Sequence, residues 1–476
     1  MNVRFFLITL FTVFKLIVSA QSNFENAVQQ LLQMPEYKNA SVGMHVVDLS
    51  SGKTLYDLNS ERVFIPASTL KLITTASAFE ILGEDYRFET KLGYQGKTEE
   101  NGELNGNLVL IGGADPALGS EYFQDHYIDF LQNWAYKIKS AGIEKVNGNF
   151  ILDGSVFDSE KVPSSWIWED IGNYYGAGPN AFTVYDNLFR ITFSSPRKVG
   201  KLTKIISISP KIEGMKIYNE VLSADNNSDN AYVYGSPLDK KRTIRGTIPR
   251  NRNAFTIKAA IHQPGEILAQ EFLKCLTREG VFVTGEIRFE AVDKKDFETI
   301  FIQESPTLTK IAEVLNCESV NLFAEHFLKQ IAVEKNGVGD REKAIELVKE
   351  FWESRGISTE YLFMEDGSGL SHFNAVSPQF FTQLLSYMAN HQSFVNSLPN
   401  AGEGTLNRFD ESLLPGNTLQ AKSGSMTRVR CYAGYMQLSS GKKVAFSFMF
   451  NHFAGSHSKL IEEMENLLVE MVDSGI

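Results

Sequence analysis

The pattern of the sequence changes twice along the chain, and these two changes most constrain the fold. Residues 41–64 alternate as strands do around the turn Ser50–Lys53, and an apolar helix follows Pro66. Residues 88–300 are short alternating segments punctuated by Gly, Asn and Pro, which is typical of a β-rich region. From Ser305 onward helical periodicity returns, and a strand pair and a last helix follow. The sequence therefore predicts an α+β domain whose two halves flank a large β-rich insertion.

The composition is that of an ordinary globular protein. Of the 476 residues 43% are hydrophobic and 22% charged, which argues against a disordered chain, a coiled coil, collagen or a polytopic membrane protein. The 46 basic and 57 acidic residues give a formal charge of −11. Because nucleic-acid binding depends on clustered Lys and Arg, no nucleic-acid partner is expected. The length predicts two to four domains, or one domain with large insertions.

The first twenty residues predict export. Arg4 precedes an apolar run, Phe5–Phe14, which resumes after Lys15 as Leu16–Val18, and Ser19 and Ala20 supply small residues at a cleavage point. The run is too short to span a membrane, so we interpret residues 1–20 as a cleaved signal peptide. An uncleaved anchor is the alternative. The sequence thus predicts a secreted, periplasmic protein, and peripheral association with the membrane or the cell wall is compatible with it.

A serine and a lysine at the start of the first long helix form a candidate nucleophile and base. Ser68 and Lys71 are three residues apart, which places both side chains on one helix face. Such a lysine can accept the serine proton if burial lowers its pKa from about 10.4 toward 7–8. The motif alone is weak, because four other pairs match it: Ser50/Lys53, Ser195/Lys198, Ser439/Lys442 and Ser456/Lys459. Of the five, only Ser68 opens a long apolar helix directly after a hairpin.

Two further motifs support this assignment. Ser319–Asn321 reads S-x-N at a predicted helical position, and Lys422–Gly424 reads K-S-G ahead of a predicted strand. A literal S-D-N occurs at Ser228–Asn230. We reject this match because it lies in a polar, Asn-rich loop of the insertion, whereas Ser319 is followed by the helical run NLFAEHFLKQ.

In this order the three motifs resemble those of the penicillin-binding proteins and serine β-lactamases. Longer phrases narrow the resemblance to the D-alanyl-D-alanine carboxypeptidase/endopeptidase family, peptidase family S13, of the penicillin-binding protein 4 type. The phrases are PASTLKLITTASA, GGADPAL, SSWIWED, ESVNLFAEHFL, EDGSGLSHFN, LPNAGEGTL and AKSGSM. This family carries accessory domains between the nucleophile and S-x-N, and here that gap, from residue 68 to 319, is 251 residues. A compact β-lactamase has no such insertion.

The resemblance implies a domain organisation. Residues 21–87 and 300–476 would form a penicillin-binding domain like that of serine β-lactamases, an antiparallel sheet flanked by helices. Residues 88–175 and 256–299 would form an inserted accessory domain II, and residues 176–255 a nested accessory domain III. Boundaries are the least reliable part of such a prediction, so we expect them within about ten residues.

The resemblance also implies a mechanism that needs no metal or cofactor. Ser68 would attack the carbonyl of the penultimate D-alanine of a peptidoglycan stem peptide, and the acyl-enzyme would then be hydrolysed. Lys71 would be the general base, and Ser319 would relay the proton to the leaving amine. Asn321 would hold Lys71 and the substrate amide, and Lys422 would supply positive charge for the terminal carboxylate. β-Lactam antibiotics would acylate the same serine.

The segment that follows Lys422 is implied in substrate binding. The hydroxyls of Ser423 and Ser425 would bind the terminal carboxylate, and the backbone N–H groups of Ser68 and Ser425 would form an oxyanion hole. Gly424 completes the K-S-G motif. This motif retains the hydroxyl of the commoner K-T-G, so little effect on the chemistry is expected.

Four more residues would contact the peptide. Asp170, Tyr175 and Met426 match positions that the family uses around the diaminopimelate side chain. His372 occupies a position that is usually Arg in the family, where it helps to hold the stem peptide. This difference changes the basis for carboxylate recognition.

Two other functions remain alternatives. A β-lactamase or esterase of the same fold would need fast deacylation, and we find no motif like the Glu-plus-water arrangement of class A enzymes. A catalytically idle, cell-wall-binding scaffold is the other alternative. It has no need for five intact catalytic groups, which argues against it. Neither H-E-x-x-H nor G-x-S-x-G occurs, so a zinc peptidase and an α/β-hydrolase are unsupported.

Overall fold

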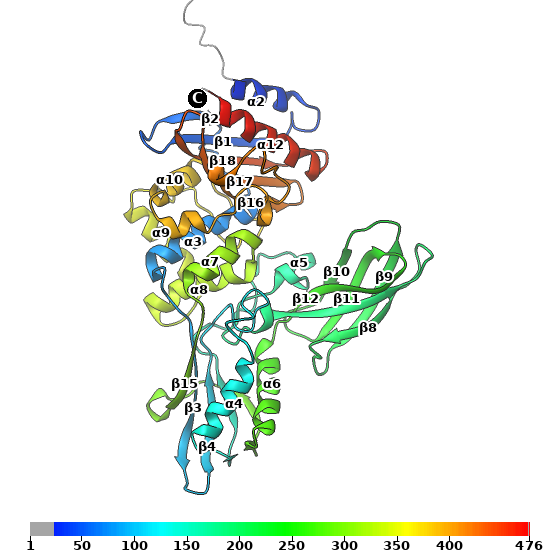
Figure 1. Cartoon of the computed structure of the whole chain (residues 1–476), viewed down its shortest axis with the longest axis vertical. Helices are drawn as coiled ribbons and strands as arrows, with labels where there is room; N and C mark the ends of the chain where they lie inside the picture. Colours follow the sequence, from blue (N-terminus) through cyan, green and yellow to red (C-terminus); the bar gives the residue numbers. More distant parts are fainter. Residues whose placement is uncertain (1–22, 475) are drawn as a thin grey trace, which may run out of the picture.

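The computed structural model describes residues 23–474 and 476, so the predicted signal peptide lies outside the described residues. Helices alternate with antiparallel and mixed sheets, as the sequence predicts for an α+β protein (Figure 1). None of the helices in this part of the chain has the length and hydrophobicity that a membrane crossing requires.

A five-stranded antiparallel sheet joins the two ends of the chain. Its strands lie in the order β16-β17-β18-β1-β2. Ser41 at the start of β1 pairs with Asn451 at the end of β18, so the sheet exists only when both ends meet. The strands are β1 (Ser41–Asp48), β2 (Thr54–Leu58), β16 (Leu419–Met426), β17 (Val429–Gln437) and β18 (Lys443–Asn451).

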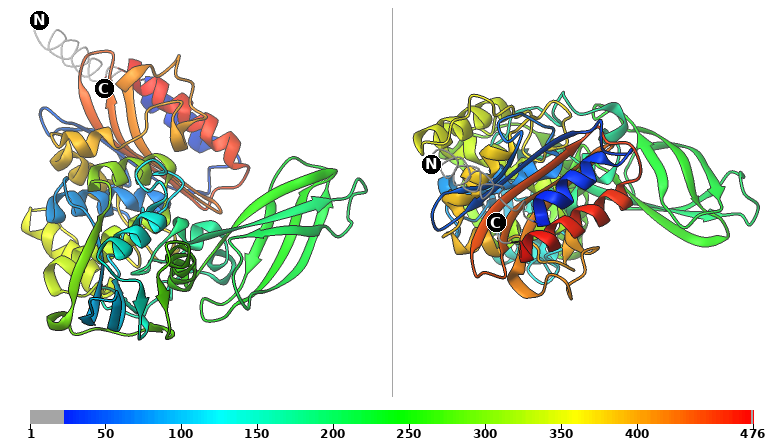
Figure 2. Two further views of the ribbon diagram at one scale, coloured as in Figure 1. Left: turned by 60° about the horizontal axis from the view of Figure 1, so that its bottom comes forward. Right: turned by 90° about the horizontal axis from the view of Figure 1, so that it is seen from above.

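Helices cover both faces of this sheet. Alternate residues of β18 divide between two apolar cores, because successive side chains of a strand point to opposite faces. Phe446 and Phe448 face the helices α2 (Asn23–Gln33) and α12 (His457–Asp473), which lie side by side over one face (Figure 2). Met449 belongs to the core that contains α3 and α10 on the other face.

The helical layer surrounds α3, the helix that follows the candidate nucleophile. The first nine residues of α3, from Lys71 to Phe79, are all buried, the polar Thr74, Thr75 and Ser77 included. Its neighbours bury it on all sides and hold its N-terminus next to β16. The helices of this layer are α3 (Lys71–Leu82), α7 (Leu308–Glu318), α8 (Asn321–Asn336), α9 (Arg341–Ser354), α10 (Pro378–Met388) and α11 (Gln392–Asn396).

The middle of the chain forms the β-rich region that the sequence predicts. Its first part is a seven-stranded sheet in the order β13-β5-β4-β3-β15, with β6 beside β4 and β14 beside β6. The helices α4 (Phe130–Ser140) and α6 (Pro264–Arg278) pack against it. The strands are β3 (Glu89–Thr98), β4 (Glu103–Ile111), β5 (Lys145–Val146), β6 (Phe150–Asp153), β13 (Phe282–Val283), β14 (Ile287–Phe289) and β15 (Glu298–Glu304).

The second part comprises two three-stranded sheets, β12-β7-β8 and β10-β11-β9, which project to one side (Figure 1). They enclose an apolar cluster of their own. The strands are β7 (Leu188–Ser195), β8 (Lys204–Ser209), β9 (Lys216–Ala224), β10 (Asn230–Tyr234), β11 (Lys241–Pro249) and β12 (Arg252–Ala260). Strand β12 continues past residue 255 and β15 spans residues 299 and 300, so two of the predicted domain boundaries fall inside strands. The division into domains stays a prediction.

Candidate active site

Ser68 and Lys71 lie at the junction of a short 3-10 turn, Ala67–Leu70, and helix α3. The Nζ atom of Lys71 is 2.9 Å from the Oγ atom of Ser68. Lys71 is completely buried, and burial lowers its pKa from the ordinary value to about 7, against the opposing effect of Asp366 and Glu325. A lysine that is partly neutral near pH 7 can accept the serine proton.

Two further acceptors fix the amine of Lys71. Its Nζ donates to Oδ1 of Asn321 and to the backbone oxygen of Ser368, each at 2.6 Å. Asn321 is the first residue of α8, and its Nδ2 donates to the backbone oxygen of Tyr175 at 2.8 Å. The structure therefore brings Asn321 of the S-x-N motif to the lysine. In the alternative S-D-N motif, Asn230 instead begins strand β10 of the projecting sheets.

Ser319 occupies a break between two helices rather than the helical position that we predicted. It caps the C-terminus of α7 with a left-handed φ of 59°, and α8 begins two residues later at Asn321. The prediction was wrong in this detail because apolar residues continue with helical spacing on both sides of the break. A single left-handed residue leaves no trace in that periodicity. Ser319 lines the same cavity as Ser68.

The K-S-G motif lies inside strand β16, which the sequence analysis did not predict, and it precedes β17, the strand that was predicted. Lys422 is completely buried, and its Nζ donates to the backbone oxygen of Ser423 at 2.9 Å. Its pKa is well below the ordinary value because of burial first, and then because of the charges of Lys71 and Arg430. Cys317 and Glu318 oppose this effect only in part.

Gly424 allows β16 to run directly against the nucleophile. A Cβ atom at this position would lie 2.5 Å from the backbone oxygen of Pro66 and 3.1 Å from the backbone nitrogen of Ser68. Only a residue without a side chain fits that approach. The next residue, Ser425, is exposed and lines the cavity, as does the buried Ser423.

One cavity of about 670 Å³ unites most of the predicted residues. Of the twelve, Lys71, Lys422 and Gly424 do not line it. The other nine do: Ser68, Asp170, Tyr175, Ser319, Asn321, His372, Ser423, Ser425 and Met426. Sequence positions from 68 to 426 thus converge on a single cleft.

Asp170, Tyr175 and His372 form a polar group at one side of this cleft. Asp170 is buried in the short helix α5 (Trp168–Ile171), and burial raises its pKa. A hydrogen bond from Tyr175 and the charge of His372 oppose that effect. Burial and the negative charge of Asp170 in turn raise the pKa of Tyr175.

The sequence analysis missed two buried carboxyl groups near Lys71. Glu325 accepts hydrogen bonds from the backbone nitrogens of Gly367, at 3.1 Å, and Ser368, at 2.8 Å, and burial raises its pKa to about 7. Asp366 accepts a hydrogen bond from Nε1 of Trp166 at 2.8 Å.

These contacts hold the loop whose Ser368 oxygen touches Lys71. The available signal was Glu325 itself, a single acid within the apolar run of a predicted helix.

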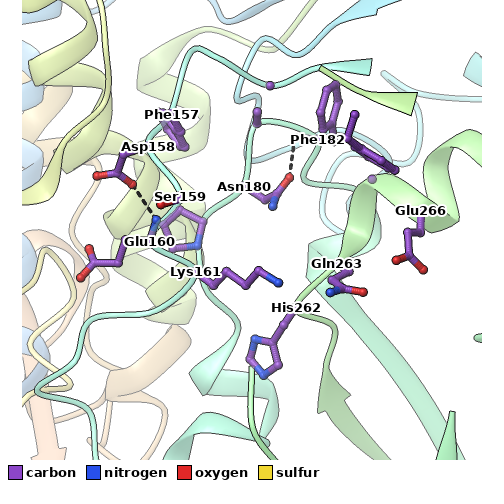
Figure 3. A pocket seen from close by; sticks show the side chains of 15 residues that line it. Phe157, Asp158, Ser159, Glu160, Lys161, Asn180, Phe182, His262, Gln263 and Glu266 are labelled. Atoms are coloured by element: carbon purple, nitrogen blue, oxygen red, sulfur yellow. Dashed lines mark hydrogen bonds between the residues drawn. The ribbon is translucent and has the colours of Figure 1, made fainter. Parts of the chain in front are cut away.

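A second cavity of about 360 Å³ lies elsewhere and contains none of the predicted residues (Figure 3). Phe157 and Phe182 supply part of its lining. Acidic residues at its edge are already paired: Asp158 with Lys329 at 2.6 Å, and Glu160 with Arg341 at 2.9 Å. Ser68 lines the larger cavity and not this one.

Fold and site together define a serine peptidase with the fold of the penicillin-binding proteins. The family model described as "D-Ala-D-Ala carboxypeptidase 3 (S13) family" matches residues 24–471. The chain belongs to this family, and the predicted family, fold class and enzyme class are confirmed.

Individual relatives agree. The chain is 28% identical over 454 residues to a D-alanyl-D-alanine carboxypeptidase of Actinomadura sp. (strain R39), covering 90% of this chain and 81% of the relative. It is 26% identical to the D-alanyl-D-alanine carboxypeptidase DacB of Haemophilus influenzae, covering 93% and 90%. The crystal structure of penicillin binding protein 4 from Haemophilus influenzae superimposes with a TM-score of 0.80 at 24% identity, over 95% of this chain and 99% of that one. This last likeness shows the fold.

Proposed function

We propose that the chain acts on peptidoglycan stem peptides through an acyl-enzyme on Ser68. As a carboxypeptidase it hydrolyses the D-alanyl-D-alanine bond, and as an endopeptidase the bond from D-alanine to a cross-linked amine. The observation that carries the proposal is the Lys71 Nζ atom, 2.9 Å from Ser68 Oγ, on a lysine whose pKa is about 7. A base of that pKa is matched to neutral conditions.

In the proposed acylation, Ser68 Oγ gives its proton to Lys71 and attacks the carbonyl of the penultimate D-alanine. The backbone N–H groups of Ser68 and Ser425 stabilise the oxyanion. Ser319 passes the proton to the leaving amine, which departs as the carbon–nitrogen bond breaks. Water then hydrolyses the ester and restores Ser68.

Substrate binding in this proposal uses the two sides of the cleft. Lys422, with the hydroxyls of Ser423 and Ser425, attracts the terminal carboxylate. The third residue of the stem lies toward Asp170, where Tyr175, Met426 and His372 also line the cavity.

We also propose that β-lactams acylate Ser68. A structure of the Haemophilus influenzae relative is described as complexed with a novel β-lactam, which supports this proposal. A β-lactamase would need a base for rapid deacylation. The buried Glu325 is bonded to backbone amides and does not line the cavity, so it offers no such base.

The domain division and the export of the protein belong to the same proposal. Residues 21–87 and 300–476 would form the penicillin-binding domain, with the remainder as accessory domains II and III. The pairing of β1 with β18 supports the first assignment. A signal peptide at residues 1–20 and action in the periplasm fit a cell-wall substrate.

Intact-protein mass spectrometry with benzylpenicillin tests the function. We expect one stable adduct per chain, absent in Ser68→Ala and present in Ser50→Ala, which removes the serine of a competing S-x-x-K motif. Release of D-alanine from a pentapeptide should follow the same pattern. Rapid loss of the adduct with antibiotic turnover would instead indicate a β-lactamase. If no adduct forms, the catalytically idle scaffold is the hypothesis that remains.

A further inference from the structure

The cleft contains a buried arginine, Arg430, that the mechanism above does not use. Arg430 lies on β17 directly opposite Ser425 of β16, and it lines the same cavity as Ser68. Opposite residues of an antiparallel pair project from the same face of the sheet, so Arg430 shares the face of Ser423 and Ser425. Only 7% of Arg430 is exposed.

The guanidinium of Arg430 is held rigidly. Its Nε donates to the hydroxyl of Tyr432 at 2.9 Å, Nη2 donates to the same oxygen, and its carbon Cζ lies 4.5 Å from the centre of the tyrosine ring. Tyr432 is itself buried. Within the described part of the chain Nη1 donates to no acceptor. A fixed donor edge therefore remains free for a ligand, and little conformational entropy would be lost when the ligand binds.

Arg430 also lacks a countercharge. Two other buried cations have one: Lys329 is paired with Asp158 and Arg341 with Glu160. No carboxylate among the described residues forms an ion pair with Arg430. An unpaired charge is costly to bury. An anion that enters the cleft beside Arg430 would compensate its charge.

We propose that Arg430 binds the carboxylate on the carbon that carries the leaving amine, together with the hydroxyls of Ser423 and Ser425. The planar guanidinium matches a carboxylate through parallel hydrogen bonds, whereas an ammonium acts as a point charge. This inference rests on the proposed function and deepens it, because it names the residue that selects the leaving group.

A selectivity follows for both reactions of the proposed enzyme. A terminal D-alanine always presents this carboxylate. In a cross-linked peptide the leaving amine presents it only when the amine-bearing carbon is also substituted by a carboxylate. Arg430 therefore favours cross-links of that chemical class over those that end on a simple alkyl amine.

Two matched peptides test the proposal: diacetyl-L-Lys-D-Ala-D-Ala and the same peptide with a C-terminal carboxamide. We expect the wild-type chain to prefer the acid. In Arg430→Gln, kcat/KM for the acid should fall roughly 10- to 100-fold, mainly through KM, and far less for the carboxamide, so that the preference collapses. Arg428→Gln removes an exposed arginine of the same hairpin that does not line the cavity, and should keep the wild-type preference.

Other outcomes separate the hypotheses. An unchanged preference in Arg430→Gln overturns the proposal, as does a collapse in Arg408→Gln instead, since Arg408 is the other arginine that lines the cavity. If Arg430→Gln loses both activities together with its thermal stability, Arg430→Lys keeps the charge and decides the question. If Arg430→Lys still prefers the acid to the carboxamide in part, the proposal is supported. If its kcat/KM falls equally on both peptides, the proposal is refuted. A wild-type chain that cleaves neither peptide refutes the proposed function itself.

Discussion

Two lysines of the cleft, Lys71 and Lys422, are completely buried, yet their surroundings differ. Lys71 donates to Ser68, Asn321 and the backbone of Ser368, and two carboxyl groups lie near it. The pKa of Lys422 is lowered by burial and by the charges of Lys71 and Arg430, and its Nζ donates to one backbone oxygen. In the proposed function the first environment supplies a base near neutrality, and the second attracts an anion. At the scale of single residues, burial is therefore the common cause of the two proposed roles.

The pKa of Lys71 gives a pH dependence with a definite sign. Below about pH 7 the amine is protonated and cannot accept the serine proton, so acylation by benzylpenicillin should slow about tenfold per pH unit. Above that pH the rate should level off. The second-order rate constant of acylation, measured from pH 5 to 9, checks this expectation, and a flat profile would contradict it.

Replacing a carboxylate by an amide tests the cause of this pKa, and a second such replacement serves as the control. The charge of Glu325 raises the pKa of Lys71, so Glu325→Gln should shift the midpoint to lower pH. Glu318→Gln, which removes an exposed carboxylate of the cavity rim, should leave the midpoint in place.

At the scale of elements, the sequence predicted most of the site because its three motifs are local. Ser68 at the start of α3 and the hairpin before it follow directly from hydrophobic periodicity. The break at Ser319 and strand β16 were missed. Periodicity does not register one left-handed residue, and the small residues of Ser423–Ser425 interrupt the alternation that indicates a strand. Glu325 and Asp366 could not be assigned either, because their effect on Lys71 depends on long-range contacts.

The contact between β16 and the nucleophile turn is the element contact most open to test. In Gly424→Ala the new Cβ would lie 2.5 Å from the Pro66 oxygen, so the strand or the turn must move. We expect acylation to slow by at least about tenfold and the free energy of unfolding to fall by about 1–3 kcal/mol. Penicillin acylation and urea denaturation measure the two effects.

Gly441→Ala is the matched control. Gly441 adopts a positive φ, of 83°, but nothing lies within 4 Å of the point that a Cβ atom would occupy there. That variant should lose stability through backbone strain while acylation stays at the wild-type rate. Equal losses of acylation in the two variants would show that contact with Ser68 is not the cause.

At the scale of the whole molecule, separate apolar clusters divide the structure. The two projecting three-stranded sheets bury residues such as Phe189, Val221 and Ile244 in one cluster. The cleft is supported by another cluster, to which Leu72 of α3 belongs. The inserted position of the projecting sheets was predicted from sequence composition. The order of their strands was not predicted. In the sheet β9 pairs directly with β11 in parallel, although β10 lies between them in the sequence.

This separation predicts that the projecting sheets can be destabilised without loss of chemistry. Ile244→Ala removes a fully buried side chain, which costs about 2–5 kcal/mol, and should speed amide hydrogen exchange within residues 216–260. Acylation by benzylpenicillin should stay at the wild-type rate. Leu72→Ala should impair both global stability and acylation. Slow acylation in Ile244→Ala would show that the two clusters are coupled.

The pairing of β1 with β18 has a consequence for folding during synthesis. The hairpin that leads into Ser68 is made early, but its partner strand ends at Asn451. Contacts so distant in sequence close slowly and late. A growing chain therefore carries Ser68 until residue 451 has been made without the strand that pairs with β1. We expect chains that end before β18 to lack acylation by benzylpenicillin.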